Sequence, residues 1–321
     1  MKKKIRKKKI ILLGGSGFIG LHLAKRISEI GWDTTILSKD TQKISKLGFS
    51  ESLTLIKGDI TRYEDVLTGI KGKDCIVNLA AVCNTSSKFD PYSDLEVNCR
   101  GQLNVLESRK NSNPNSKYIF LGSRMQFGIV REDDMPIKDE HCQNPISLYG
   151  IHKTTAENYC KLYKRAFNLN SIVLRLPIVY GFNLIGDNKN NIIPHLVKKA
   201  INNEKFYING YGSDIKDLLY VDDIIDLILL VIDSKVKNGA FNVGSGQKIR
   251  FIDLAEKIIK LLNSGSYEAV PFPKELAKFE LGSFYFDTSG LKKIFKWMPK
   301  TSLDDGLIKI MDFFKNSVRS G

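Results

Sequence analysis

The segment GGSGFIG at residues 14–20 constrains the fold more than any other part of the chain. It follows the short apolar run IILLG (10–14) and opens a stretch (18–31) whose aliphatic side chains recur at helical spacing. Glycines at such a junction permit a tight turn and let backbone N–H groups approach an anion at the positive end of the helix. The context predicts a dinucleotide-binding strand–loop–helix unit, with a flexible turn as the alternative. The residues expected to bind the cofactor here are Gly14, Gly17, Phe18, Ile19 and Gly20.

The first half of the chain alternates between apolar runs and helical patterns. Further strands are expected at 34–38, 52–60, 74–81, 117–123 and 171–176, and a long helical stretch lies at 94–110. Strands alternating with helices favour a parallel sheet that is covered on both faces. Right-handed crossovers then give an α/β fold with a doubly wound parallel (Rossmann) sheet.

The second half is less regular, with helical patterns at 221–233, 251–262 and 302–315. It indicates a smaller mixed α/β C-terminal lobe that is interleaved with the main sheet. The predicted organisation is a basic tail, a dinucleotide-binding domain and a substrate lobe. In residue numbers these are 1–8 for the tail, 9–177 (with 215–245 returning) for the domain, and 178–214 with 246–318 for the lobe.

The net charge of +14 raises the question of an anionic partner. The opening MKKKIRKKK carries seven of these charges and leaves +7 for the remaining residues, which is typical of a solvated basic tail. We therefore expect phosphate-bearing small molecules, rather than nucleic acid, as the anionic partners.

Composition also indicates the compartment. The longest apolar run, IIDLILLVI (224–232), is too short to span a bilayer, and glycines follow the charged N-terminus too closely for a signal peptide. Five cysteines without a CxxC pair suit reduced thiols, and four scattered histidines show no metal-ligand spacing. The expectation is a soluble, cytoplasmic protein without a metal site.

The end of the second strand bears on the choice between NAD and NADP. A carboxylate there would accept a hydrogen bond from the ribose 2′-hydroxyl of NAD, whereas this chain has Ser38 and Lys39, which could accommodate a 2′-phosphate. The pattern therefore favours NADP, but a misalignment of one residue would bring Asp40 into place, so both cofactors stay open. Asp59, after the third strand, offers a carboxylate for the adenine amino group or simply belongs to a turn.

Residues 147–153 read SLYGIHK, which places Tyr149 and Lys153 four positions apart. On a helix these positions lie on one face, where the ammonium group could favour the anionic form of the phenol. An exposed pair without a function has the same spacing, so the motif needs support from the rest of the chain.

That support comes from the order of GGSGFIG, GDI, NLAA, SLYGIHK and YVDD along the chain. With these motifs the sequence resembles the extended short-chain dehydrogenase/reductase family, in particular its nucleotide-sugar epimerases, dehydratases and reductases. The resemblance runs from about residue 9 to residue 316 and includes the closing segment DTSGLKKIFKWMPKTSLDDGL. Together these motifs identify the family, but they distinguish poorly between the reactions that its members catalyse.

The resemblance implies a catalytic set of Ser123, Tyr149 and Lys153. In such enzymes the tyrosine is the acid/base, the lysine binds the nicotinamide ribose and lowers the tyrosine pKa, and the Ser hydroxyl bonds the reacting oxygen. Ser123 matches by standing five residues before Gly128 in FLGSRMQFG. The resemblance also implies cofactor contacts from Ile60, Ala80 and Pro177.

Several positions depart from the family pattern. Arg124 and Met125 stand where many dehydratases carry Asp-Glu, which argues against a 4,6-dehydratase; Arg124 could reach a phosphate or a sugar carboxylate, or form a structural salt bridge. Ile178 replaces the Asn of "NVYG", and Lys216 replaces an arginine that grips the diphosphate, so the substrate site is expected to involve Arg124, Ile178 and Lys216.

The resemblance therefore implies an NAD(P)-dependent nucleotide-sugar epimerase that acts through transient oxidation at sugar C4. The alternative is a one-way 4-reductase or 4-dehydrogenase in deoxy-sugar or surface-polysaccharide synthesis. A non-catalytic cofactor-binding scaffold is a third reading, against which the intact catalytic set argues. A nucleotide-diphosphate sugar as substrate and a homodimer are also expected from the family.

Overall fold

The computed structural model describes residues 7–83, 90–185 and 191–319. Within these residues the chain forms two compact units, each described separately below. The first contains Met1–Gln126, Pro145–Arg175 and Ile228–Phe241, and the second contains Phe127–Asn144, Leu176–Leu227 and Asn242–Gly321.

The first unit is built on a seven-stranded sheet with the strand order β10-β6-β5-β4-β1-β2-β3. The strands are β1 (Lys9–Leu13), β2 (Asp33–Ser38), β3 (Leu53–Lys57), β4 (Cys75–Asn78), β5 (Lys117–Ser123), β6 (Ile172–Leu176) and β10 (Gly239–Asn242). The neighbouring pairs from β3 through β2, β1 and β4 to β5 are parallel. The sequence order 3-2-1-4-5-6 reverses next to β1, as in a doubly wound fold, so the predicted fold class is confirmed.

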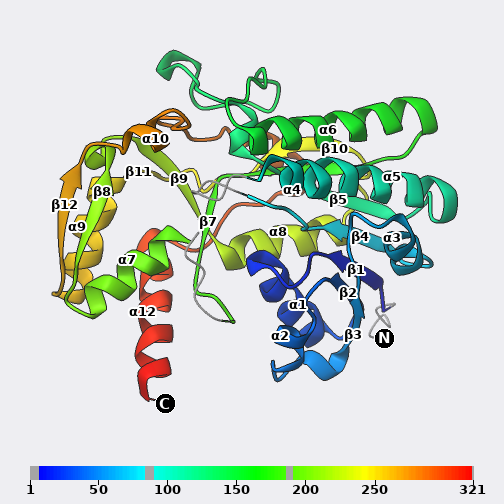
Figure 1. The fold of residues 1–321 in the computed structure, drawn as a ribbon, viewed down its shortest axis with the longest axis horizontal. Helices are drawn as coiled ribbons and strands as arrows, with labels where there is room; N and C mark the ends of the chain where they lie inside the picture. The colour runs from blue at the N-terminus through cyan, green and yellow to red at the C-terminus, as the bar shows by residue number, and fades with distance from the viewer. Residues whose placement is uncertain (1–6, 84–89, 186–190, 320–321) are drawn as a thin grey trace. The chain divides into compact units, whose positions relative to one another are not determined.

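Helices cover both faces of this sheet (Figure 1). They are α1 (Phe18–Ile30), α2 (Gln42–Ser45), α3 (Tyr63–Ile70), α4 (Pro91–Leu95), a π-helical turn (Glu96–Arg100), α5 (Gly101–Ser112) and α6 (Leu148–Phe167), with short 3-10 turns at Ser50–Ser52 and Arg124–Gln126. On one face α3, α5 and α6 bury a core with the strands, including Ile11, Val105, Tyr118 and Ala156. Because strand side chains alternate, the buried Ile10 and Leu12 point to the face of the sheet opposite to that of Ile11.

Two predicted strands are shorter in the structure. Residues 58–60 form a turn after β3, and residues 79–81 leave the sheet after β4. Both segments lie at the carboxyl ends of parallel strands, where the chain must turn away from the sheet and where such folds bind their ligands.

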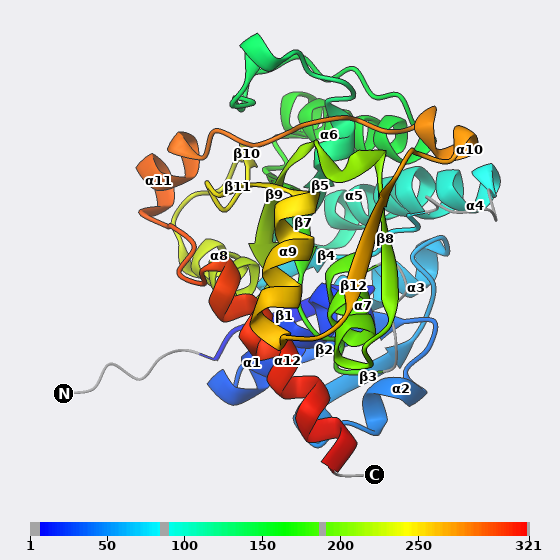
Figure 2. The ribbon, with the colours of Figure 1, turned by 90° about the vertical axis from the view of Figure 1, so that its left-hand side faces the viewer.

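The second unit contains a three-stranded sheet in the order β11-β9-β7 and a parallel pair, β12-β8. Its elements are β7 (Ile178–Tyr180), α7 (Ile192–Ile201), β8 (Lys205–Asn209), β9 (Ile215–Tyr220), β11 (Lys248–Arg250), α9 (Phe251–Leu262), β12 (Ser266–Val270), α10 (Lys274–Ala277), α11 (Ser289–Phe295) and α12 (Leu303–Arg319), with 3-10 turns at Glu132–Asp134 and Gly210–Gly212. Figure 2 shows β8 and β12 side by side next to α9. Helix α8 (Val221–Asp233) begins in this unit and ends in the first.

Residues 127–144 belong to the second unit, whereas the sequence predicts them within the dinucleotide-binding domain. Ile137 pairs with Phe286, and Asn242 bonds both the Ile137 carbonyl and the Asp139 carboxylate, which ties this segment to the C-terminal residues. Which ligand each unit binds stays a prediction.

Candidate active site

The structure brings Ser123, Tyr149 and Lys153 together within the first unit. Ser123 ends β5, and the two other residues lie on α6, four positions apart. The Ser123 side chain lies beside that of Tyr149 and lowers the pKa of its phenol, and the Lys153 Nζ lies 5.7 Å from the centre of the Tyr149 ring. The Ser123 Oγ also accepts the Met125 backbone N–H at 3.2 Å, which leaves its own proton for a further acceptor.

Gly150 explains how α6 approaches the turn after Ser123 so closely. A Cβ added to Gly150 would lie 2.3 Å from the Met125 carbonyl oxygen and 2.9 Å from the Pro145 Cβ. Real Cβ atoms do not tolerate such distances, so a glycine between Tyr149 and Lys153 permits the contact that brings Ser123 to the phenol.

Burial dominates the electrostatics of this group. The Lys153 side chain is buried, which lowers its pKa to about 8, and its ammonium group donates to the Leu121 carbonyl at 2.9 Å. Burial also raises the pKa of Tyr149, while the neighbouring Ser123 side chain acts in the opposite direction. The phenol therefore needs a further positive charge beside it to ionise near neutral pH.

A buried polar network that sequence reasoning missed lies directly behind these residues. The Asp94 Oδ1 bonds the His152 Nδ1 at 2.6 Å and accepts from the Asn98 amide at 2.6 Å, and Asn98 also donates to the Val82 carbonyl. His152 stands between Tyr149 and Lys153 in the motif. A polar, titratable histidine next to the catalytic pair is the one sequence feature that could have predicted this network. The network fixes the N-terminal part of α6 against the preceding helices and gives Asn98 a structural role.

The glycine loop fits a pyrophosphate group. A Cβ on Gly14 would lie 2.6 Å from the Ala80 Cα, and one on Gly20 would lie 2.7 Å from the Gly15 Cα, so these two glycines permit close backbone packing. A Cβ on Gly17 would meet only the Gly14 carbonyl oxygen, at 3.5 Å, so a ligand can approach the Gly17 backbone. Gly17 caps α1 without a side-chain hydrogen bond, which leaves the first N–H groups of the helix for an anion.

Lys39 and Asp59, predicted to contact different parts of the cofactor, form an ion pair at 2.8 Å. Burial raises the pKa of Asp59, but hydrogen bonds from Lys39 and Thr61 outweigh it, and the net pKa is lowered. Ser38 bonds the Ser16 hydroxyl of the glycine loop at 2.5 Å. The charge of Lys39 is therefore already compensated by a carboxylate.

The remaining predicted cofactor residues have distinct surroundings. Ala80 packs its backbone against Gly14, whereas the Ile60 side chain belongs to the core and its carbonyl accepts from Asn104. Pro177 lies in the second unit, between β6 and β7.

The three predicted substrate residues are divided between the units. Arg124 follows Ser123 in the first unit, while Ile178 and Lys216 belong to the second. Ile178 packs against an apolar cluster of the second unit that comprises Phe127, Val130, Ile137, Phe284 and Phe286.

Lys216 is buried and its charge is compensated within the second unit. Its Nζ donates to the Glu280 carboxylate and to the Gly282 carbonyl, both at 2.7 Å, with Asp214 at 3.5 Å. A ligand that uses Lys216 must compete with Glu280.

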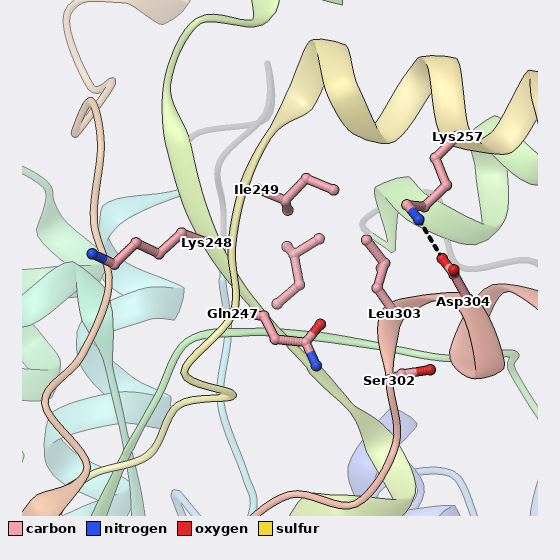
Figure 3. A pocket seen from close by; sticks show the side chains of 8 residues that line it. Gln247, Lys248, Ile249, Lys257, Ser302, Leu303 and Asp304 are labelled. Atoms are coloured by element: carbon pink, nitrogen blue, oxygen red, sulfur yellow. Dashed lines mark hydrogen bonds and ion pairs between the residues drawn. The ribbon is translucent and has the colours of Figure 1, made fainter.

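A pocket of about 270 Å³ opens in the second unit (Figure 3). Lys257 and Asp304 form an ion pair at its rim, at 2.5 Å. Its lining residues are Leu218, Gln247, Lys248, Ile249, Lys257, Ser302, Leu303 and Asp304. None of the predicted site residues is among them, so this pocket is distinct from the predicted site.

No helix within the described parts of the chain combines the length and apolar composition that a bilayer crossing requires. The same residues contain no cluster of three or more His, Cys, Asp or Glu side chains able to hold a metal ion.

Comparisons with known proteins agree with this geometry. Residues 10–244 match the model of the NAD-dependent epimerase/dehydratase family. The chain is 27% identical over 316 residues to a putative UDP-glucose 4-epimerase of Methanocaldococcus jannaschii, covering 97% of this chain and 100% of that protein. It is also 27% identical to the CDP-paratose 2-epimerase of Salmonella typhi, covering 95% and 98% of the two chains.

The fold matches the crystal structure of the Thermotoga maritima UDP-glucose 4-epimerase with UDP-glucose. The TM-score is 0.87 at 24% identity, and the match covers 97% of this chain and 99% of that one. The predicted relation to the epimerases and dehydratases, the enzyme class and the nicotinamide cofactor are confirmed by the family match. With its doubly wound sheet, glycine loop and matching motifs, the chain belongs to the NAD-dependent epimerase/dehydratase family.

Proposed function

We propose that this chain is a nucleotide-sugar epimerase that transiently oxidises its substrate at sugar C4. The observation that carries the proposal is the Ser123–Tyr149–Lys153 group, in which a hydroxyl, a phenol and an ammonium meet at the end of β5. The names of the relatives, a putative UDP-glucose 4-epimerase and a CDP-paratose 2-epimerase, support a nucleotide-diphosphate sugar as substrate.

In the proposed reaction Tyr149 exchanges the proton of the sugar hydroxyl. A bound nicotinamide cofactor supplies the chemistry of accepting a hydride from the carbon that bears this hydroxyl and of returning it. Lys153 and the positive charge of an oxidised cofactor favour the phenolate, which takes the hydroxyl proton as the carbonyl forms. Ser123 donates a hydrogen bond to the same sugar oxygen, and Tyr149 returns the proton in the reverse step.

The cofactor we propose is NAD, held by the backbone of Gly14, Gly17, Phe18, Ile19 and Gly20. The ion pair between Lys39 and Asp59 supports this choice, because a compensated lysine is a poor partner for a 2′-phosphate. Tyr149 and Lys153 would contact the nicotinamide side, with Pro177, Ala80, Ile60 and Ser38 as further contacts.

On the substrate side we propose Arg124, Ile178 and Lys216, with Lys216 exchanging Glu280 for a phosphate of the substrate. A homodimer, a cytoplasmic location, a role in surface-polysaccharide synthesis and the absence of nucleic-acid binding are further parts of the proposal. They rest on the family pattern and on the concentration of basic charge at residues 2–9.

The second candidate is a one-way 4-reductase or 4-dehydrogenase. Ile178 favours it, because this residue stands at the Asn position of the NVYG pattern and packs its aliphatic side chain against an apolar cluster, so it offers no amide to hold the substrate. This candidate would exchange its cofactor in each turnover, whereas an epimerase regenerates it.

The deciding experiment is to denature the purified protein, identify any released dinucleotide by mass spectrometry, and incubate the native protein with UDP-glucose and UDP-galactose. Bound NAD together with interconversion of the two sugars supports the epimerase, and Tyr149→Phe should lower that rate by about a hundredfold or more. Preferential binding of NADPH without interconversion would favour the reductase instead. An active Tyr149→Phe variant would contradict the catalytic assignment.

A further inference from the structure

Gln126 ends the 3-10 turn that follows Ser123, and both ends of its side-chain amide are engaged. Its Oε1 accepts the Ser123 backbone N–H at 2.7 Å, and its Nε2 donates to the Glu157 Oε2 at 2.8 Å. Gln126 and Glu157 are both 0% exposed, so water does not replace these bonds. The side chain therefore connects Ser123 to α6, the helix that carries Tyr149 and Lys153.

Glu157 is itself firmly held. Arg175, on β6, donates from Nε to Oε2 at 2.9 Å and from Nη2 to Oε1 at 2.7 Å, and Lys161 lies 3.0 Å from Oε1. Burial raises the pKa of Glu157, but Arg175 outweighs it and lowers the pKa to about 2, so the carboxylate is ionised at neutral pH. A carboxylate only accepts hydrogen bonds, which turns the NH₂ of Gln126 towards Glu157 and its carbonyl oxygen towards Ser123.

The surrounding backbone leaves room for this contact. A Cβ on Gly122 would lie 2.5 Å from the Gln126 Oε1 and 3.1 Å from the Arg175 Cγ. Glu157 stands four residues after Lys153, so it lies on the same face of α6, one turn further along. One helix thus carries the phenol, the ammonium and the anchor of the serine turn.

We propose that Gln126 is a positioning residue that fixes the Ser123 hydroxyl against Tyr149 through the buried Glu157–Arg175 pair. The inference rests on the proposed function, in which Ser123 bonds the reacting sugar oxygen. Gln126 does not touch the substrate in this role. Its effect is on the geometry of the reacting group, where a displacement of about 1 Å can cost a hundredfold in rate.

The test replaces Gln126 by methionine, which has a similar length and neither donates to Glu157 nor accepts well from Ser123. With UDP-glucose and UDP-galactose as substrates, kcat should fall by about tenfold or more, while KM and the NAD affinity change by less than about threefold. The matched control is Gln102→Met, which removes another buried amide, bonded to Cys160 and Tyr118. Its melting temperature should fall comparably without the loss in kcat; equal losses of kcat in both variants would overturn the proposal.

A double-mutant cycle separates this proposal from the proposed function. If Gln126 acts through Ser123, Ser123→Ala combined with Gln126→Met should be no slower than Ser123→Ala alone. If the losses in kcat of the two single variants instead multiply in the double variant, the positioning role is overturned. A Ser123→Ala variant as fast as the wild type would instead contradict the proposed function.

A crystal structure of Gln126→Met gives a readout independent of turnover. The Ser123 hydroxyl should move away from the Tyr149 phenol, and an unchanged position of both groups would overturn the proposal. Should this variant not fold, Gln126→Asn replaces it in both tests, because its amide is too short to span both partners.

Discussion

At the residue scale, the ammonium group of Lys153 is needed for the proposed function, but its burial lowers the stability of the folded protein. The folded-state pKa of about 8 lies below the ordinary value of 10.5, so both folded and unfolded states are protonated at pH 7. The folded protein then bears the whole cost of burying the charge, on the order of 3 kcal/mol at 1.4 kcal/mol per pKa unit. As the pH rises from 8 towards 10.5, the amine loses its proton in the folded protein before it does so in the unfolded chain. The cost of burying the charge then disappears.

Lys153→Met should therefore be more stable than the wild type at pH 7 and nearly inactive. The difference in melting temperature should shrink at pH 9.5, because only the wild type gains stability over this range. Thermal unfolding of both proteins without cofactor, at the two pH values, measures it. A variant that is destabilised by the same amount at both pH values would contradict the expectation.

The Lys39–Asp59 pair makes a second prediction at this scale. Asp59→Asn removes the compensating charge while keeping an oxygen that can accept the Thr61 N–H, so Lys39 becomes available to a 2′-phosphate. The ratio of the Kd values should shift towards NADP⁺ by about three- to fivefold, the size expected of an exposed ion pair. Fluorescence titration with both cofactors measures it, and Lys39→Ala should shift the ratio the other way. An unchanged ratio would show that the pair does not select the cofactor.

At the element scale, the approach of α6 to the turn after β5 depends on Gly150. Gly150→Ala would place a methyl group 2.3 Å from the Met125 carbonyl oxygen, so the helix or the turn must move. We expect a loss of about 1–3 kcal/mol of stability, the usual effect of overpacking, together with a fall in kcat as Ser123 leaves Tyr149.

The control is Gly48→Ala, since no atom other than those of the residue itself and its chain neighbours lies within 4 Å of a Cβ at that position. Thermal unfolding and turnover of both variants provide the comparison. If Gly150→Ala proves as harmless as Gly48→Ala, the glycine does not determine the contact.

At the scale of the whole molecule, exposed apolar side chains on α4 and α6 support the proposed dimer. Leu95, Ile151 and Leu162 are 44%, 43% and 52% exposed, and the two helices lie close together in the first unit (Figure 1). A pair of chains could bury these side chains, as oligomers with two-fold symmetry do.

Light scattering after gel filtration should give twice the chain mass of 36.2 kDa. Leu162→Glu should raise the dissociation constant of the dimer by at least about tenfold, because it places a charge in an apolar contact. Leu261→Glu, on α9, is the matched control, since Leu261 is 41% exposed in the second unit. A dimer unaffected by Leu162→Glu would place the contact elsewhere.

The sequence by itself determined the features that are local along the chain. The alternation of apolar runs and helical patterns identified six of the seven strands of the main sheet but missed β10, and the helical patterns at 221–233 and 251–262 coincide with α8 and α9. The spacing of Tyr149 and Lys153 placed both on one face of a helix, because helical geometry repeats every 3.6 residues.

Only the tertiary structure decided which partner each long polar side chain takes. Lys39 binds Asp59, Lys216 binds Glu280, and Gln126 joins Ser123 to Glu157, pairs that are distant along the chain in most cases. The shift of the Tyr149 pKa also depends on the tertiary structure, because burial in the folded protein raises this pKa. Hydrophobic periodicity reports which face of an element is buried, but a flexible charged side chain selects its partner from whatever groups the packed fold brings within reach.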